Sequence, residues 1–300
     1  GNQKEKILNA LNNLESGGST AGGKGIELAY KLAEKNFKKN GNNRVILATD
    51  GDFNVGASSD ENMEKLISNK RETGVFLSVL GFGYGNYKDS KLEILADKGN
   101  GNHAYIDTMQ EAQKVFGQEF GGTLHTIAKD VKIQVEFNPN KVKGYRLIGY
   151  ENRLLNDEDF IDDTIDAGEL GAGHKVTALY EIILAGTENE FLKEVPNLKY
   201  TEHNSKSSIN NDELFTVKFR YKKPSEDKSI EMIHIQNDEI TKASEDMKFA
   251  SAVALFGLKL RKSQYIHKIE NSAIIELANS GRGEDVNGYR AEFIRLVKSI

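Results

Sequence analysis

Apolar residues in the first part of the chain alternate between short continuous runs and helical spacing. The runs at residues 45–49 and 75–83 have the length and composition of strands that are buried on both faces. Apolar residues three or four positions apart lie before, between and after these runs, and they predict helices, including one over residues 112–125. Strands separated by helices of this length are typical of βαβ units. The first part therefore predicts an α/β fold with a parallel sheet and helices on both faces.

The middle and last parts of the chain show two other patterns. Apolar and polar residues alternate over 131–137, 176–182 and 214–221, which predicts half-buried antiparallel strands and a β-sandwich. Residues 156–173 and 187–212 are polar and predict loops. Helical spacing returns after residue 240. We therefore expect three parts: a partial α/β domain at 1–126, a β-sandwich domain at 127–238 and a C-terminal helical region at 239–300.

Composition limits the classes of function. Acidic residues outnumber basic ones, 45 against 40, which gives a net charge of −5 and argues against nucleic-acid binding and against a polybasic membrane surface. The chain has no cysteine, so disulfides, thiolate metal sites and a cysteine nucleophile are excluded. No apolar stretch is long enough to span a bilayer, and no signal peptide is visible. The chain opens at Gly1 rather than at Met, which suggests a processed or truncated start.

Two short segments carry the candidate chemistry. Residues 17–22 form a Gly-rich loop with the hydroxyl of Thr20 before a helix, and the strand at 45–49 is followed directly by Asp50. A hydroxyl and a carboxylate at the C-terminal edge of a parallel sheet suit Mg²⁺. Two oxygens are too few for a cation that requires six, and Asp52 is a further candidate ligand. The alternative interpretation is structural: Asp50 caps its turn, and Thr20 caps the following helix.

These segments resemble the second half of a von Willebrand factor type A domain, in particular that of bacterial proteins that join such a domain to a conserved C-terminal region. The family binds a metal at a metal-ion-dependent adhesion site built from three loops. Thr20 matches the second loop and Asp50 the third, whereas the Asp-x-Ser-x-Ser of the first loop has no match in the chain. The resemblance therefore implies an incomplete site that holds Mg²⁺ weakly or not at all. It extends over the whole chain, through the segments 45–56, 99–108, 145–151, 168–180 and 249–263.

The resemblance also implies that the opening strands of the family's sheet are missing, so that the chain is truncated at its N-terminus. The strand at 45–49 would then be an edge strand with bare backbone groups and apolar faces. A soluble protein does not leave such an edge exposed. We therefore expect this edge to pair with another copy, to exchange an element with it, or to be covered by later residues of the same chain.

The function that the residues and the resemblance favour is non-enzymatic. It is a protein–protein interaction or adhesion module, which binds a protein partner at the face of Thr20 and Asp50, because the chain offers no nucleophile with a base in reach. Similarity to envelope-associated bacterial proteins favours an extracytoplasmic location. Two alternatives stay open. One is a metal-assisted hydrolase at the same sheet edge, with His103 as its base. The other is a structural assembly module whose helical tail docks partners.

Overall fold

The chain forms two compact units, and each is built from segments that lie apart in the sequence. The first unit contains residues 1–131, 166–174 and 221–228, and the second contains residues 132–165, 175–220 and 229–300. A computed structural model describes residues 2–15, 22–39, 41–50, 60–84, 88–124, 126–151, 153–165, 167–192, 212–239 and 241–300.

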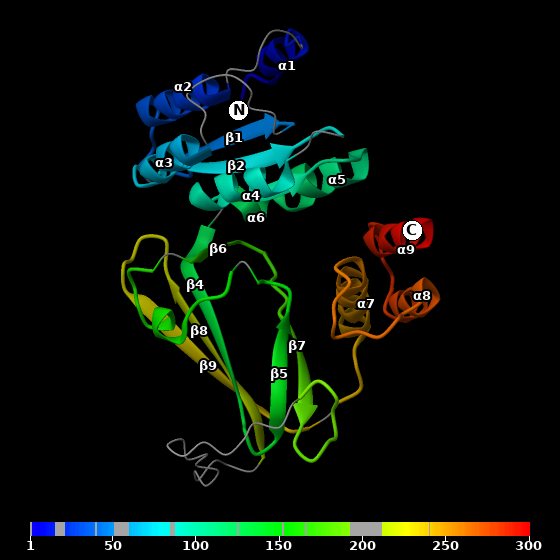
Figure 1. Cartoon of the computed structure of the whole chain (residues 1–300). Helices are drawn as coiled ribbons and strands as arrows, with labels where there is room; N and C mark the ends of the chain where they lie inside the picture. The colour runs from blue at the N-terminus through cyan, green and yellow to red at the C-terminus, as the bar shows by residue number, and fades with distance from the viewer. Residues whose placement is uncertain are drawn as a thin grey trace. The chain divides into compact units, whose positions relative to one another are not determined.

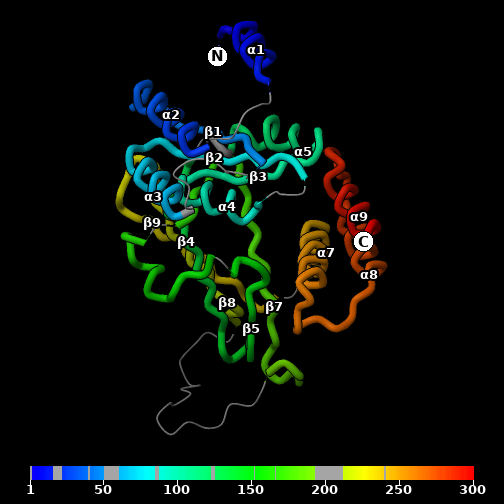
Figure 2. Tube along the Cα trace, turned by 45° about the horizontal axis from the view of Figure 1, so that its top comes forward, coloured from blue at the N-terminus to red at the C-terminus, as the bar shows by residue number. Residues whose placement is uncertain are grey.

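The first unit contains a parallel sheet whose strands lie side by side in the order β1-β2-β3. Figure 1 labels β1 and β2, and Figure 2 labels all three strands. Helices separate these strands along the chain, as the sequence pattern predicts for βαβ units. The chain runs through α1 (Lys4–Asn12), α2 (Gly22–Lys35), β1 (Arg44–Thr49), α3 (Asp60–Arg71), β2 (Phe76–Gly81), α4 (Asp89–Lys98), β3 (His103–Tyr105) and α5 (Met109–Gln113).

Apolar side chains of β2 pack against helices on both faces of the sheet. Leu77 and Val79 point to one face, where they pack in a cluster with residues of α2, α3 and α4. Leu80 points to the other face and packs with Ile106 and Val115. Since neighbouring side chains of a strand point to opposite faces, one apolar strand supplies both cores. The predicted α/β fold is confirmed.

Strand β1 lies at the edge of this sheet. Within the described part of the chain it pairs with β2 on one side only, as the sequence analysis predicts for this strand. The side chain of Ile46 in the middle of β1 is 45% exposed. Helix α1 is similarly uncovered, because none of its residues is buried although Ile7, Leu8 and Leu11 form an apolar stripe. The first unit thus presents apolar surface on its edge strand and on α1.

The prediction of a single helix over residues 112–125 is wrong. The segment is divided into α5, a π-helical turn η1 (Lys114–Gln118) and α6 (Phe120–Leu124). Glycines at positions 117, 121 and 122 weaken a continuous α-helix, since each is roughly 1 kcal/mol less favourable than alanine. Packing also requires a glycine at position 122, because a Cβ there would lie 2.6 Å from the carbonyl oxygen of Ala172.

Antiparallel strands follow, as the period-two pattern predicts. A four-stranded sheet has the order β6-β4-β8-β9, and β5 pairs with β7 in a separate antiparallel sheet. The ring centroid of Phe137 in β4 lies 4.6 Å from the ring centroid of Tyr145 in β5 and 5.4 Å from that of Tyr180 in β7. The description as a β-sandwich stays a prediction. The strands are β4 (Thr126–Phe137), β5 (Val142–Ile148), β6 (Gly168–Gly171), β7 (Leu179–Leu184), β8 (Glu213–Lys222) and β9 (Ser229–Asn237).

The segment at 156–173 is not only a loop, as its polar composition predicted. It contains the short 3₁₀ helix η2 (Asp157–Phe160) and strand β6, which pairs with the start of β4. β6 is four residues long and begins and ends with glycine, so it lacks the alternation by which strands are recognised.

The last part of the chain is helical, as predicted. Helices α7 (Glu245–Leu260), α8 (Asn271–Ser280) and α9 (Tyr289–Ser299) share one core. No helix in the described part of the chain is long and apolar enough to cross a membrane. The predicted domain boundaries after residues 126 and 238 stay predictions. The buried residues of this core are Ala252, Phe256, Ile274, Ala278, Ile294 and Val297.

Candidate functional site

The three parallel strands end level with one another. Thr49, the last residue of β1, pairs with Gly81 of β2, and Gly81 pairs with Tyr105 of β3. The residues that follow these strands therefore lie along one edge of the sheet, where α/β folds commonly place ligands. Asp50 is the first residue after β1. We call this edge the sheet rim, and its described residues are 50, 82–84 and 106–109.

Hydrogen bonds fix the turn that follows β2. The amide nitrogen of Phe82 donates to the carbonyl oxygen of Thr49 at 2.9 Å. The hydroxyl of Tyr105 donates to the carbonyl oxygen of Gly83 at 2.6 Å. Gly83 has a φ of +96°, which favours glycine, and a Cβ on it would lie 3.7 Å from the Cβ of Asp50. The turn after β2 is thus held beside Asp50 by contacts to both neighbouring strands.

The rim exposes two large side chains with apolar surface, Tyr84 and Met109, at 83% and 75%. The hydroxyl of Tyr84 donates to the carbonyl oxygen of Asp107 at 3.3 Å, and Met109 begins α5, which is capped by the side chain of Thr108. Desolvation, then the neighbouring Tyr84 and Asp107, raise the pKa of Tyr105 above its ordinary value. Sequence reasoning assigned no role to Asp107, which follows the end of β3 by two residues, whereas Tyr84 lies in the loop 83–89 that it placed on the recognition face.

Of the predicted metal ligands, the structure places Asp50 at the rim. Thr20 and Asp52 lie outside the described residues, so the predicted convergence of Thr20 and Asp50 stays a prediction. The described residues contain no group of three His, Cys, Asp or Glu side chains that could hold a metal ion. Asp50 and Asp107 follow strands that are two spacings apart, roughly 9–10 Å. These donors do not fit Mg²⁺, which requires near-octahedral oxygen ligands.

His103, the base nominated for a hydrolase, does not lie at the rim. It pairs with Val79, which pairs with Leu47, so it is level with the interior of β1 and two strands away from it. Its Nε2 lies 3.7 Å from Oδ1 of Asp89, and its side chain is 13% exposed. A general base must come within hydrogen-bond reach of the reacting group, directly or through one water. The geometry therefore gives the hydrolase alternative no support.

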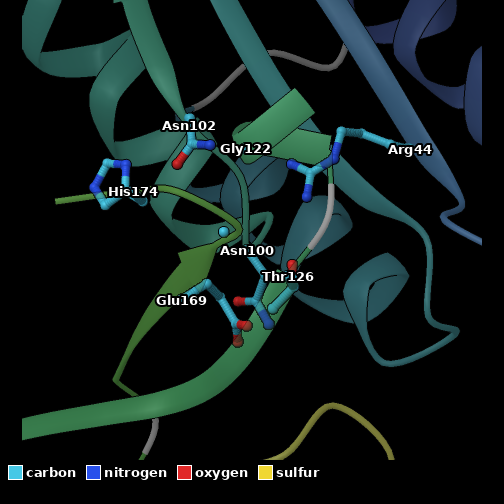
Figure 3. A pocket seen from close by; sticks show the side chains of 8 residues that line it. Arg44, Asn100, Asn102, Gly122, Thr126, Glu169 and His174 are labelled. Atoms are coloured by element: carbon cyan, nitrogen blue, oxygen red, sulfur yellow. The ribbon is translucent and has the colours of Figure 1, made fainter. Parts of the chain in front are cut away.

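A second polar cluster surrounds a cavity of about 10 Å³ at the start of β1 (Figure 3). Nη1 of Arg44 donates to Oγ of Ser78 at 2.7 Å, and the buried Nε of Arg44 has no hydrogen-bond partner among the described residues. Burial lowers the pKa of Arg44, and the charge of Glu169 opposes this effect. A cavity of this volume holds about one water. The cluster therefore anchors the start of β1 and offers no room for a larger ligand.

An open cleft of about 340 Å³ lies in the second unit, among residues of α7, α9 and the turn before α9. Arg290 forms an ion pair with Asp246 and donates to the carbonyl oxygen of Gly281 at 2.5 Å. The carboxylate of Asp285 accepts hydrogen bonds from the backbone amides of Arg290 and Ala291, at 3.0 and 2.8 Å. These charges are engaged in holding the ends of the helices together, so the cleft is a structural junction.

Two family models match the chain. The model described as uncharacterized protein YfbK, C-terminal, matches residues 122–300, and the model of the von Willebrand factor type A domain matches residues 1–118. The chain is 45% identical over 299 residues to the uncharacterized protein YfbK of Escherichia coli (strain K12). This match covers 99% of the chain and 51% of the relative, so the chain spans about half the length of that curated protein.

A solved structure described as von Willebrand factor type A from Catenulispora acidiphila is also similar. It aligns with a TM-score of 0.40 and 12% sequence identity, over 97% of this chain and 65% of the other. This likeness is too distant to carry an argument about function. The two family models instead divide the sequence between them, and the chain belongs to the YfbK family, with a von Willebrand factor type A domain followed by the YfbK C-terminal region.

Proposed function

We propose that this chain is a non-enzymatic protein-interaction module and that its binding surface is the sheet rim around Asp50. Domains of the von Willebrand factor type A family generally mediate protein–protein interactions. The observation that carries the proposal is the level ending of β1, β2 and β3. It gathers Asp50, Tyr84 and Asp107 along one edge, where a partner can contact all three strand ends together.

The proposal does not depend on a metal ion held by this chain alone. The matching family often binds a divalent metal at the corresponding edge, but the described donors do not supply the six oxygens that Mg²⁺ requires. We expect a titration with Mn²⁺, followed by electron paramagnetic resonance, to show only weak binding. Tight, Asp50-dependent binding of one Mn²⁺ would contradict this part of the proposal.

The edge strand suggests how copies of the chain associate. Since β1 pairs on one side only within the described residues, its outer backbone groups are a template for another strand. We include in the proposal that a second copy pairs with, or exchanges an element at, residues 45–49. We also include an extracytoplasmic location, in the cell envelope or periplasm, which fractionation of cells that express the tagged protein would test.

The experiment that tests the proposed function is quantitative capture of partners. Immobilised wild-type chain, Asp50→Ala and the matched control Asp97→Ala are incubated with extract of cells that make the protein, with and without EDTA. Asp97 is an exposed acidic residue of α4, so its loss removes the same charge elsewhere. We expect proteins whose recovery falls with Asp50→Ala and not with Asp97→Ala. Recovery that neither Asp50→Ala nor EDTA changes would exclude this surface.

A further inference from the structure

We propose that the outer end of the sheet rim, formed by Tyr84, Asp107 and Met109, is a subsite for an arginine side chain of the protein partner. The inference rests on the proposed function, since it names a feature of the partner that binds the same edge. It concerns β3 and the turn after β2, whereas the resemblance stated in the sequence analysis implies Asp50 at the end of β1.

The charge of the rim indicates the sign of the partner. The described rim residues 50, 82–84 and 106–109 include two carboxylates, Asp50 and Asp107, and no lysine or arginine. The Asp107 side chain is exposed, so a partner reaches it from solvent. A cation of the partner therefore meets complementary charge there, which orients binding and favours the correct partner over anionic ones.

The exposed side chains next to Asp107 indicate which cation fits. The ring of Tyr84 is 83% exposed, and its hydroxyl is tied to the backbone of Asp107 at 3.3 Å. Aromatic rings attract cations to their faces, and a guanidinium stacks on such a ring more readily than an ammonium. Met109, which is 75% exposed, offers apolar surface to the methylene stem of an arginine.

The subsite is preorganised by the turn that carries Tyr84. The Tyr105 hydroxyl holds the carbonyl oxygen of Gly83 at 2.6 Å, one residue before Tyr84. Fixing an aromatic side chain before binding reduces the entropy that is lost on association. Tyrosine and methionine are also enriched at the centres of protein interfaces. An exposed tyrosine whose hydroxyl is anchored to the backbone of an exposed aspartate thus has the properties of a binding residue.

Methionine methyl groups provide a direct test, because the chain has four methionines. Met109 reports on the subsite, and Met63, Met232 and Met247 lie on other elements. The whole chain, labelled with ¹³C at the methionine methyl groups, is titrated with N-acetyl-arginine amide and, in parallel, with N-acetyl-citrulline amide. Citrulline has nearly the shape of arginine and no charge. We expect a saturable shift of the Met109 signal with arginine, a much smaller one with citrulline, and no shift of the other signals.

Three variants complete the test. Tyr84→Leu should weaken the arginine response about two- to fivefold, the equivalent of an exposed cation–π contact. Asp107→Asn should also weaken it, whereas the control Asp97→Asn should not. Unchanged signals of the three other methionines establish that each variant is folded. No shift of Met109 with arginine, an equal shift with citrulline, or an unchanged response in Asp107→Asn would overturn the proposal.

The same titration with Asp50→Ala separates this inference from the proposed function. If the arginine response survives in Asp50→Ala while the capture of partners is independent of Asp50, the subsite stands and the proposed role of Asp50 fails. If capture depends on Asp50 but Met109 does not respond to arginine, the proposed function stands and the subsite fails.

Discussion

The hydroxyl of Tyr105 donates a 2.6 Å hydrogen bond to the carbonyl oxygen of Gly83. Tyr105 is the last residue of β3, and Gly83 lies in the turn after β2, so this bond joins the ends of two neighbouring strands. Gly83 in turn lies against Asp50, since a Cβ on it would be 3.7 Å from the Asp50 Cβ. One phenol thus organises the edge on which the proposed function depends.

Removing this hydroxyl should loosen the sheet rim without unfolding the sheet. In Tyr105→Phe, the Gly83 carbonyl loses its donor while the ring is kept, so we expect amide hydrogen exchange in residues 81–84 to become faster, by about twofold or more. Exchange measured by mass spectrometry tests this expectation. The matched control Tyr150→Phe also removes a tyrosine hydroxyl, which donates a hydrogen bond of 3.1 Å to the carbonyl oxygen of Thr177. Equal exchange at 81–84 in the wild-type chain and Tyr105→Phe would show that the bond has no organising role.

The edge strand predicts a specific effect on self-association. Ile46 in β1 is 45% exposed, and Ile94 in α4 is 43% exposed. Substitution by lysine therefore replaces a similarly exposed apolar side chain at either position. Charge on an edge strand opposes pairing with another chain. We expect Ile46→Lys to lower the average mass in sedimentation at high protein concentration and Ile94→Lys to leave it unchanged. Both variants behaving alike would contradict pairing at β1.

Lys132 should be important for stability although it is charged. Its side chain is buried, and Nζ donates to the carbonyl oxygens of Asp159, at 2.8 Å, and Asp162. Lys132→Met leaves both carbonyls without this donor, which costs on the order of 1–3 kcal/mol. Hydrogen exchange in residues 157–164 should therefore become much faster. The control Lys129→Met removes an exposed ion pair with Asp227, and we expect little change. Equal effects of the two variants would refute the role of Lys132.

Acid should weaken the start of α9 through Asp285. Burial alone would raise the pKa of this carboxyl, but the backbone amides of Arg290 and Ala291 and the charge of Arg282 hold it below its ordinary value. A carboxylate with a lowered pKa stabilises the folded state above the unfolded pKa of about 3.9, and the contribution disappears as the pH falls through the folded pKa.

Asp285→Asn tests this pH dependence. The wild-type chain should be more stable than the variant above about pH 4, by on the order of 1 kcal/mol for the lost cap, and the difference should shrink as the pH falls further. Thermal unfolding of both proteins between neutral and acidic pH, followed by circular dichroism, measures the difference. Comparison with the variant isolates Asp285 from Asp246, whose pKa is also lowered, chiefly by the hydrogen bond from Arg290. A difference that is independent of pH would contradict this assignment.

The sequence was sufficient to predict the parallel sheet because its strands are continuous apolar runs between amphipathic helices. The β1 and β2 strands were located closely, at Arg44–Thr49 and Phe76–Gly81. Strand β6 was missed, because it has four residues and depends on pairing with β4 rather than on its own pattern. The division of the 112–125 helix was missed for a related reason. Close approach of Gly122 to Ala172 is a contact between distant residues, which helical periodicity does not reveal.

The candidate site was predictable only in part. Asp50 could be placed from sequence, since it follows an apolar strand and matches a family position. The contact between Tyr84 and Asp107 could not be predicted, because the hydrogen bond between them joins residues 23 positions apart. Their relation depends on the register of β2 and β3, in which Gly81 pairs with Tyr105. Strand register depends on the connection between the strands as well as on the hydrophobic pattern, and the two apolar runs by themselves do not fix it.

The most direct measurement is site-specific photo-crosslinking on the sheet rim. A photoreactive phenylalanine analogue is placed at Tyr84, and for comparison at Tyr265, which is 41% exposed and belongs to the second unit. Both proteins are irradiated in cells that make the partner, and adducts are identified by mass spectrometry. The account predicts a protein adduct at position 84 that is absent at position 265 and is lost when Asp50→Ala is added. Adducts at position 265 alone, or adducts at position 84 that persist in Asp50→Ala, would contradict it.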